Sequence, residues 1–262
     1  MNIVSIQLQG GLGNQMFQIA TTYAYAKRFN FTPKFDFNRC VTSHQGFSSQ
    51  KYLNNLFKNL VDLDTSKINF NNYFKEPKHS FTPIPKYNNN LFLDGYFQSE
   101  KYFKDFKTDI KNIFKLDEKY YEKINKFITT LPNQDNLTAL HVRRGDYLKF
   151  PGIHDVCTLE YYNEAMDIIG DGSFIVVSDD MDWCKRNING KNVYHSPFTD
   201  ELEDLYLMSM CKNNIIANSS FSWWGAWLND NKDKKVIAPK IWFGVSGPKE
   251  QDDIIPEEWI KI

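Results

Sequence analysis

A pair of arginines beside a glycine is the first candidate for chemistry in this chain. The segment 141–147 reads HVRRGDY and follows an apolar run, Leu137 to Leu140, that is typical of a buried strand of a parallel sheet. In open α/β sheets ligands bind beyond the carboxyl ends of strands, and a guanidinium fork matches the geometry of phosphate. Arg143 and Arg144 therefore predict a phosphate site. A surface turn in which they pair with nearby carboxylates is the alternative.

Polar clusters also follow two other predicted strands. Ser178-Asp179-Asp180 ends the strand predicted over 174–178, and Asn218-Ser219-Ser220 ends the one predicted over 214–217. Carboxyl ends of parallel strands lie along one sheet edge, so we expect these clusters to converge with the arginines. The segment 218–222 also opens a predicted helix, whose free backbone N–H groups and dipole favour an anion. Convergence favours the phosphate site over the surface turn.

The aspartates of the second cluster allow two interpretations. Asp180 and Asp182 form a DxD pattern, which can hold a divalent metal between the phosphates of a nucleotide sugar. Aspartates at a strand end can equally cap the helix that follows and complement its dipole. We predict the cap, because Arg143 and the helix start near Ser219 already supply positive potential. A metal-dependent glycosyltransferase remains the alternative.

A glycine-rich loop near the N-terminus suggests a different nucleotide chemistry. Alternating apolar residues predict a strand over 4–8, the loop Gly10–Gln15 reads GGLGNQ, and a helical pattern follows from Met16. Asp36 lies near the spacing of a ribose-binding acid, so an NAD(P)-dependent oxidoreductase is a competing hypothesis. Met16 argues against it, because the dinucleotide fingerprint needs a small residue there.

The elements that position these residues predict an α/β fold with parallel sheets. Strands and helices alternate after residue 136, and the turn-rich segment 129–136 is the best linker, which predicts domains over 1–132 and 133–262. The segment 101–127 is amphipathic and breaks near Asp117, with lysines on one side and aromatic residues on the other. We expect a solvated lysine face over a core face, and a weak peripheral membrane contact is the alternative.

Composition excludes several classes of function. The 262 residues carry 31 basic and 32 acidic side chains, so there is no excess positive charge for general nucleic-acid binding. The four cysteines lie far apart without metal-ligand spacing, and no segment is typical of a signal peptide or a membrane span. We therefore expect a cytoplasmic protein with free thiols that acts on a small molecule.

Four segments together resemble the α-1,2-fucosyltransferases of bacterial type. In this sequence they are Gly10–Gln18 (GGLGNQMFQ), Asp94–Ser99 (DGYFQS), His141–Tyr147 (HVRRGDY) and Asn218–Gly225 (NSSFSWWG). The resemblance spans most of the chain. It implies a GT-B-like architecture of two Rossmann-like domains facing a cleft, the first on the acceptor side and the second binding GDP-β-L-fucose. It further implies inverting transfer of fucose to the 2-hydroxyl of a galactose-terminated oligosaccharide or glycolipid, with no metal and no other cofactor.

The resemblance also implies roles for single residues. Arg143 is expected on the pyrophosphate and His141 near guanine. Asp204, on the acidic helix before the serine motif, corresponds more loosely to an acid that contacts guanine in relatives. The remaining expected contacts are Ser219, Ser220 and Ser222 with phosphate, and Asn14, Gly11 and Gly13 with fucose. What resembles a nicotinamide fingerprint is then better interpreted as a wall of the sugar site.

The catalytic base is not given by the resemblance. The α-1,6-fucosyltransferases carry a glutamate a few residues after their arginine pair, whereas this chain has Leu148 to Pro151 there. We predict Asp146 as the base that deprotonates the acceptor hydroxyl, with His154 as the second candidate. Asp146 has a competing structural role as an ion-pair partner of Arg144. The acceptor glycan and the oligomeric state are left open by the sequence.

Overall fold

The computed structural model describes residues 1–42, 46–60 and 62–262, and these form two compact units. Unit 1 comprises Met1–Leu116 with Lys249–Pro256, and unit 2 comprises Asp117–Pro248 with Glu257–Ile262. The sequence predicts a boundary after residue 132, but the units divide before the helix α3 (Glu118–Ile128). The reason is packing, since Tyr121 and Phe127 of α3 make edge-on ring contacts with Tyr206 and Phe198 of unit 2.

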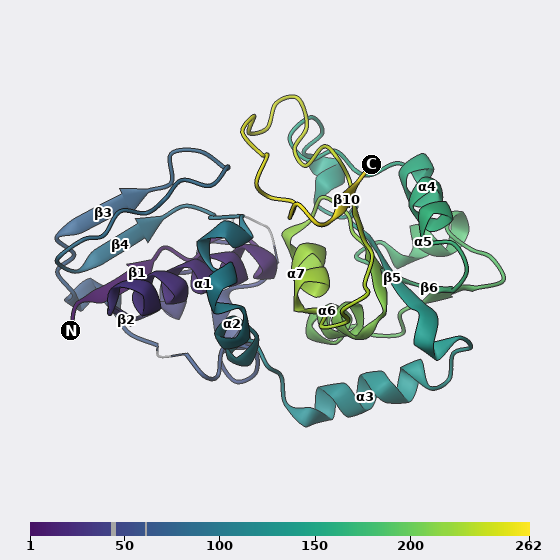
Figure 1. Cartoon of the computed structure of the whole chain (residues 1–262), viewed down its shortest axis with the longest axis horizontal. Coiled ribbons are helices and arrows are strands. Elements are labelled where there is room, and N and C mark those ends of the chain that lie inside the picture. Colours follow the sequence, from purple (N-terminus) through teal and green to yellow (C-terminus); the bar gives the residue numbers. More distant parts are fainter. Residues whose placement is uncertain (43–45, 61) are drawn as a thin grey trace. The chain divides into compact units, whose positions relative to one another are not determined.

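Unit 1 is built on a four-stranded parallel sheet in the order β2-β1-β4-β3 (Figure 1). Its strands and α-helices are β1 (Ile3–Ile6), α1 (Leu12–Phe29), β2 (Thr32–Pro33), β3 (Asn72–Lys75), β4 (Leu91–Asp94) and α2 (Lys107–Ile113). Its 3-10 helices are η1 (Phe37–Arg39), η2 (Ser49–Tyr52), η3 (Thr65–Lys67), η4 (Glu100–Tyr102) and η5 (Lys104–Phe106). The sheet thus joins the start of the chain to a segment about 90 residues later, because β1 lies between β2 and β4.

The helix α1 follows directly from the glycine loop. Gly11 precedes its first turn, and the helix ends at Asn30, whose backbone is left-handed. Basic residues in the last turn, Lys27 and Arg28, complement the negative end of the helix dipole. Met16 is fully buried, so the position that a dinucleotide fingerprint reserves for a small residue holds a core side chain instead. The chain returns to unit 1 over Lys249–Pro256, where Asp253 forms an ion pair with Lys101 and accepts the Phe81 N–H.

Unit 2 is a doubly wound six-stranded sheet, parallel throughout, in the order β10-β9-β8-β5-β6-β7 (Figure 1). Its elements after α3 are η6 (Gln134–Asn136), β5 (Leu137–Val142), η7 (Tyr147–Lys149), α4 (Leu159–Ile169), β6 (Ser173–Ser178), α5 (Met181–Asn187), β7 (Val193–His195), α6 (Glu201–Met210), β8 (Asn213–Ile215), α7 (Ser220–Leu228), β9 (Val236–Ala238) and β10 (Ile260–Lys261). The α/β class and the parallel sheets predicted from the sequence are confirmed.

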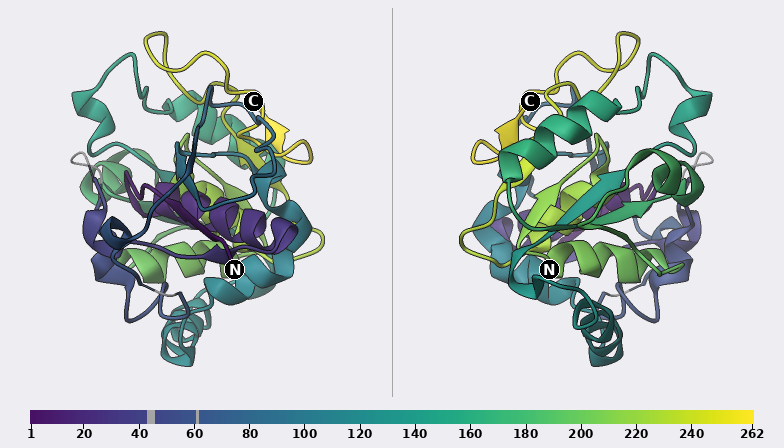
Figure 2. Two further views of the ribbon diagram at one scale, coloured as in Figure 1. Left: turned by 90° about the vertical axis from the view of Figure 1, so that its left-hand side faces the viewer. Right: turned by 90° about the vertical axis from the view of Figure 1, so that its right-hand side faces the viewer.

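Helices cover both faces of this sheet, as the side views also show (Figure 2). On one face Leu140 and Val176 pack against α4 and α5 through Tyr162 and Cys184. The other face is covered by α6 and α7, which pack against each other and place Phe221 beside the ring of His141. Because β8, β5 and β6 are neighbours, the polar clusters that follow them leave the sheet at adjacent positions on one edge.

The lysine-rich segment forms two helices, α2 and α3, separated before Asp117 as the sequence predicts. Ile124 of α3 is fully buried, and Lys123 on its flank forms an ion pair with Glu203 of α6. The apolar side of this segment is therefore packed against the rest of the protein, as the sequence predicts. Within the described residues, no helix combines the length and the apolar character that a bilayer crossing requires.

Candidate functional site

Arg143 is held between two carboxylates at the carboxyl end of β5. Its Nη2 lies 2.6 Å from Asp146 Oδ1, and its Nη1 lies 3.0 Å from Asp179 Oδ2 at the end of β6. The side chain is one-quarter exposed, and its Nε is buried without a hydrogen-bond partner in the described part of the chain. The predicted convergence of the β5 and β6 clusters is confirmed by this contact.

The two carboxylates on Arg143 are not equally fixed. Asp179 Oδ1 also accepts the Arg144 N–H at 2.9 Å, and a Cβ at position 145 would lie 2.5 Å from Asp179 Oδ2, so a side chain there would displace this carboxylate. Asp146, in contrast, has its ion pair with Arg143 as its side-chain contact. The Asp179 carboxylate is therefore held in place by contacts besides its ion pair with Arg143. The Asp146 carboxylate is held by that ion pair alone among the side-chain contacts of the described residues.

Arg144 does not pair with Asp146, which corrects that alternative from the sequence. Its Nε donates to Asp180 Oδ2 at 3.1 Å, and its guanidinium carbon lies 3.9 Å from the ring centre of Trp183. The physical reason is that the two arginine side chains point in different directions. Arg143 turns toward Asp146 three positions later, while Arg144 turns to the opposite side, over α5. Arg144 is thus a structural residue that anchors the start of α5.

The charge of this cluster also differs from the expectation. Arg143 and Arg144 carry two positive charges, and Asp146, Asp179 and Asp180 carry three negative charges, so the formal sum is −1. The sequence alone predicts that both arginines supply positive potential that is free for an anion. In the structure that potential becomes available to an anion only when a carboxylate is displaced.

His141 lies inside the protein at the end of β5. The side chain is 3% exposed and its Nδ1 has no hydrogen-bond partner among the described residues. Burial is the main cause that lowers the pKa of His141 to about 3, while Asp179 opposes and Arg143 reinforces that shift. His141 is therefore neutral at physiological pH, and one unpaired ring nitrogen is left to meet a ligand or a water.

Tyr147 and His154 connect the arginine segment to the rest of the edge. The Tyr147 hydroxyl donates to the Asn218 carbonyl oxygen at 2.8 Å, which ties the β5 segment to the segment after β8. The His154 ring stacks on Tyr147 with a centroid distance of 4.7 Å and also contacts Phe243. Burial lowers the pKa of His154, an effect opposed by Asp146. His154 is thus a half-buried, neutral imidazole close to the arginine cluster.

The helix α7 begins with an open set of backbone donors. Ser219 is its N-cap but makes no side-chain cap, and the first turn contains no acidic residue. The N–H groups of residues 220–222 have no intramolecular acceptor in the described part of the chain. An uncapped helix start with free N–H groups is a favourable place for an anionic oxygen. Ser219 is buried and Ser220 half-buried at this start.

Two other residues of the serine motif have structural contacts. The Ser222 hydroxyl is fully buried and donates to the Ala217 and Ser219 carbonyl oxygens at 3.4 and 3.3 Å. The Asn218 amide donates to the carbonyl oxygens of Asp155 and Trp242. Asn218 therefore holds together the loops around the site. Ser222 braces the turn that aims the helix N–H groups, and we assign its hydroxyl that role.

Asp204 lies at the far side of the same edge, next to the end of β7. Its Oδ1 accepts the Ser196 hydroxyl at 2.5 Å. Burial raises the pKa of Asp204 to about 7, and the neighbouring Glu203 and Asp200 carboxylates add to the shift while the Ser196 hydrogen bond opposes it. A buried carboxyl of this kind gains from a ligand that donates N–H groups to it.

Asp180 caps α5, as the sequence predicts. Its Oδ1 accepts the Trp183 N–H at 3.2 Å and its Oδ2 accepts from Arg144, so both carboxylate oxygens are engaged. Asp182 lies in the first turn of the same helix, where a negative charge complements the dipole. The described residues contain no cluster of three or more side chains suited to a metal ion.

The glycine loop of unit 1 forms a second polar cluster around Asn14. Gly10 has φ +75°, and a Cβ there would lie 2.4 Å from Asn14 Nδ2, so the loop closes tightly over the asparagine. Gln98 donates through Nε2 to Asn14 Oδ1 at 2.7 Å. The Asn14 amide nitrogen is left as a donor, and Gln98 Oε1 is a buried acceptor without a partner among the described residues.

Glu76 fixes the segment that carries Gln98. Its carboxylate accepts the Tyr96 N–H at 2.7 Å and the Phe97 N–H at 3.0 Å, and Phe97 has a left-handed φ of +52°. Burial raises the pKa of Glu76 to about 7, partly offset by these two hydrogen bonds. The strained backbone at Phe97 is therefore held by a carboxylate at the end of β3, and it positions Gln98 against Asn14.

The Asp36 carboxylate is already hydrogen-bonded within unit 1. Its Oδ2 accepts the Thr65 N–H at 2.9 Å and the Thr65 hydroxyl at 2.8 Å, and its side chain is 5% exposed. A ribose-binding acid needs a carboxylate that is free for two hydroxyls. With Met16 buried in the helix that follows the glycines, neither residue supports the oxidoreductase hypothesis.

Sequence reasoning assigned no role to Asp179, Gln98 or Glu76. Asp179 and Gln98 lay inside segments that had been singled out, so their position at strand ends was a usable signal. Glu76 gave no such signal, because its role depends on the pairing of Lys75 with Asp94 in β3 and β4.

Unit 2 is a doubly wound parallel sheet with the arginine and serine segments at its carboxyl edge, and unit 1 has a glycine loop after β1; this architecture is that of a GT-B-like glycosyltransferase. The chain belongs to glycosyl transferase family 11, whose model matches residues 1–262. It is 32% identical to an α-1,2-colitosyltransferase of Escherichia coli, over 100% of this chain and 99% of that protein. It is 25% identical to galactoside α-(1,2)-fucosyltransferase 2 of Oryctolagus cuniculus, over 86% of this chain and 66% of that protein. The fucosyltransferase NodZ from Bradyrhizobium has a similar fold, with a TM-score of 0.55 at 14% identity over 86% of this chain and 92% of that one.

Proposed function

We propose that this enzyme transfers L-fucose from GDP-β-L-fucose to the 2-hydroxyl of a terminal galactose, with inversion and without a metal. The observation that carries the proposal is that Arg143 and the uncapped start of α7 follow adjacent strands, β5 and β8, and that the Tyr147 hydroxyl ties the two following segments together at Asn218. A diphosphate placed there gains a guanidinium and backbone N–H groups. The proposed site of action is cytoplasmic, and no cofactor is needed beyond the sugar nucleotide.

A second donor is favoured by one comparison. A relative that matches the full chain is an α-1,2-colitosyltransferase. Colitose is fucose without the 3-hydroxyl, so the two donors differ by one hydrogen-bonding group. Discrimination between them requires a protein group that pairs with that hydroxyl, because a buried polar partner left empty is costly. GDP-colitose is therefore the competing donor.

Donor binding begins with an exchange of partners on Arg143. The diphosphate replaces Asp146, which has one interaction to lose, while Asp179 keeps its contacts with Arg143 and the Arg144 N–H. The exchange transfers one side of the guanidinium from the Asp146 carboxylate to the diphosphate, whose further negative charge faces the N–H groups at the start of α7. It also frees the Asp146 carboxylate beside the phosphates. Guanine is proposed to lie near His141 and Asp204, where the buried carboxyl accepts its N–H groups.

The chemical step is one displacement at the anomeric carbon. Positive charge develops on the sugar, and negative charge grows on the departing GDP. Arg143 and the α7 N–H groups act where this charge appears, which is where fixed dipoles contribute most. The loop with Gly11, Gly13 and Asn14 is proposed to hold the fucose, with Ser219 and Ser220 at the phosphates.

The acceptor hydroxyl loses a proton during transfer. Asp146 is the proposed base once it leaves Arg143, and such catalysis is typically worth about 10² to 10⁴ in rate. His154 is the second candidate, because its imidazole is neutral and lies near the same carboxylate. Asp146 and His154 both belong to the segment after β5, which also carries Arg143, so both candidate bases lie on the same side of the sheet edge as the arginine.

The test is a donor and acceptor panel with the purified chain. GDP-fucose, GDP-colitose, GDP-mannose and UDP-galactose are each incubated with lactose, with and without EDTA, and products are identified by NMR of the anomeric proton. An α-1,2-fucosylated product formed equally in EDTA supports the proposal. Transfer of colitose in preference to fucose would reassign the donor. Binding of NAD without GDP, or a strict requirement for manganese, would overturn it.

A further inference from the structure

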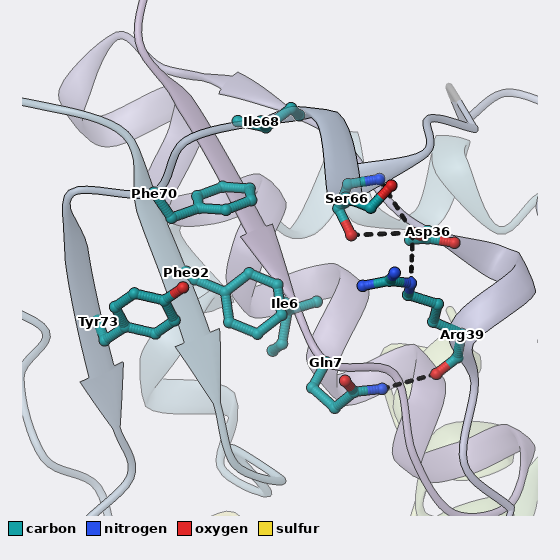
Figure 3. Close-up of a pocket in the computed structure, with 10 residues that line it drawn as sticks. Ile6, Gln7, Asp36, Arg39, Ser66, Ile68, Phe70, Tyr73 and Phe92 are labelled. Atoms are coloured by element: carbon teal, nitrogen blue, oxygen red, sulfur yellow. Dashed lines mark hydrogen bonds and ion pairs between the residues drawn. The ribbon is translucent and has the colours of Figure 1, made fainter.

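Unit 1 contains a pocket of about 270 Å³. None of its lining residues belongs to the four segments that resemble the α-1,2-fucosyltransferases. It lies beside β1, β3 and β4 and is bounded by the loops after β2 and around η3 (Figure 3). Its lining side chains include Gln7, Asp36, Arg39, Ser66, Tyr73 and Phe92. The pocket belongs to unit 1 alone, so it is separate from the arginine cluster of unit 2.

One wall of this pocket is aromatic. Register in the sheet places Tyr73 of β3 directly beside Phe92 of β4, with ring centroids 5.8 Å apart, and Phe70 meets Phe92 edge-on at 5.1 Å. Tyr73 is 69% exposed, although aromatic residues of this size usually gain much of their stabilisation from burial. Tyr73 therefore presents a large exposed ring at the pocket, where it can pack against a ligand.

The opposite wall is polar and offers both donors and acceptors. Figure 3 shows the Arg39 guanidinium directed toward the middle of the pocket, opposite the aromatic wall. Its terminal nitrogens have no partner among the described residues, and its Nε lies 3.7 Å from Asp36 Oδ2. Gln7 donates through Nε2 to the Arg39 carbonyl oxygen at 2.7 Å, which leaves Oε1 as an acceptor. Donors and acceptors on one wall suit hydroxyl groups, since each hydroxyl can do both.

The charge of the pocket selects against an anion. Arg39 is the cation and Asp36 is the carboxylate beside it, so their formal charges cancel. A phosphate or a nucleotide would meet the Asp36 carboxylate together with the guanidinium, whereas a neutral polyol has no such penalty. A pyranose has an apolar face of C–H groups and hydroxyl groups around its edge. The C–H face can pack on the aromatic wall while the hydroxyl groups bond to the polar wall opposite.

We propose that this pocket binds a neutral pyranose unit of the acceptor glycan other than the galactose that is modified. This inference rests on the proposed function. The pocket lining includes neither Asn14 nor Gln98, the residues assigned to the transferred sugar, so we assign its occupant to a part of the acceptor that does not react. It makes unit 1 selective for oligosaccharides over free galactose.

Two variants and two matched controls test the subsite. Tyr73→Ala removes the ring, and Arg39→Gln replaces the guanidinium with a shorter, neutral amide. Lys75→Ala is the control on the same strand, and Lys67→Ala, at the last residue of η3, is the control for an exposed cation; neither residue lines the pocket. Circular dichroism and the Tm are compared first, so that only folded variants enter the assay.

The expected result is a change in KM that depends on acceptor length. Tyr73→Ala and Arg39→Gln raise KM for galactose-terminated tri- and tetrasaccharides about 5- to 20-fold, with kcat, KM for free galactose and KM for the donor unchanged. Both lysine controls match the wild type. Equal changes for free galactose and oligosaccharides, or no change for either variant, would overturn the subsite.

Saturation-transfer NMR with the oligosaccharides, without donor, separates this inference from the proposed function. Glycan signals that the wild type gives and Tyr73→Ala loses support the subsite even if no fucose transfer is ever observed. Transfer of fucose with glycan signals that are identical in Tyr73→Ala would leave the proposed function standing and remove the subsite. Displacement of the glycan from this pocket by GDP would assign the pocket to a nucleotide and overturn the inference.

Discussion

Arg143 and Asp146 form an ion pair across three residues, with Nη2 of the arginine 2.6 Å from Oδ1 of the aspartate. The proposed reaction asks these two groups to do different things, one binding diphosphate and the other accepting a proton. In the free enzyme they neutralise each other. Asp179 remains bound to the guanidinium when the pair separates, so Arg143 keeps its orientation. We propose that the donor diphosphate separates the pair when it binds, and we call the Arg143–Asp146 pair the latch.

Asp146→Asn tests this latch. We expect kcat to fall by at least about a hundredfold, because the variant lacks the base. GDP affinity should be unchanged or several-fold tighter, since an amide competes less well than a carboxylate for Arg143. Steady-state kinetics and calorimetric titration of GDP measure the two quantities. A kcat within a few-fold of wild type, or a loss that arises from weaker GDP binding, would remove Asp146 from the role of base and leave His154 as the candidate.

Arg143→Lys examines the other half of the pair. A lysine keeps the charge but cannot hold Asp179 and a diphosphate oxygen at the same time. Two charge-assisted hydrogen bonds of roughly 1.5–3 kcal/mol each are at stake, so kcat/KM should fall about a hundredfold or more. Arg186→Lys, on the exposed surface of α5, is the matched control. Near-normal turnover of Arg143→Lys would contradict the assignment.

The fold was predictable where local pattern and topology agree. The strand predicted over 174–178 agrees with β6 to within one residue, because a continuous apolar run between turn residues leaves few alternatives. The segment 32–90 resisted prediction. Its elements are two- to four-residue strands and single turns, whose stability comes from pairing with β1 and β4 rather than from periodicity.

The sequence was sufficient to predict where the candidate site lies, but not which side chains form ion pairs within it. Strand ends located Arg143, Asp180 and Ser219, since parallel topology brings such ends to one edge. Which carboxylate meets which arginine depends on side-chain direction, and a single sequence does not contain that information. Asp146 was assigned to Arg144 as its alternative partner for this reason. The domain boundary likewise depended on Tyr121 packing against Tyr206, a contact between positions distant in sequence.

Asp180→Asn distinguishes a helix cap from a metal ligand. The variant keeps an acceptor for the Trp183 N–H but weakens the ion pair with Arg144, so we expect a loss of about 1 kcal/mol in unfolding free energy and a small loss of activity. EDTA should leave the wild-type rate unchanged. Chemical denaturation and a transfer assay with and without manganese provide the measurements. Activity abolished by EDTA and restored by manganese, together with a much larger effect of Asp180→Asn, would favour the metal reading.

Asp204 predicts a pH dependence of stability. Its pKa is raised from 3.8 to about 7, so the folded protein binds this proton more tightly than the unfolded chain. Between about pH 4 and pH 7 the folded state therefore carries more protons, and stability contributed by this group falls as pH rises, with the loss complete above about pH 7. Asp204→Asn should be more stable than wild type by about 1–3 kcal/mol at pH 8 and similar to it near pH 4. Denaturation at the two pH values provides the check.

The same carboxyl should make donor binding depend on pH. If ionised Asp204 accepts the N–H groups of guanine, GDP-fucose affinity rises as pH increases from about 6 to 8, and Asp204→Asn binds weakly with a flat profile. GDP-fucose is the suitable ligand because its diphosphate is a diester that does not titrate in this range. A wild-type profile without slope, or an identical slope in the variant, would remove Asp204 from the guanine site.

Gln98 and Asn14 offer the last prediction, which concerns the sugar rather than the nucleotide. Gln98 donates to Asn14 Oδ1 at 2.7 Å and retains a buried, unpaired Oε1, and Glu76 holds the turn that presents it. Gln98→Ala should lower kcat for fucose transfer by about ten- to a hundredfold while GDP affinity stays within twofold, because the asparagine loses its orientation. A double-mutant cycle with Asn14→Ala measures the coupling through kcat/KM. If the two residues act as a unit, the double variant is little worse than the poorer single variant. Additive losses, or a fall in GDP affinity as large as the fall in rate, would separate Gln98 from the sugar site.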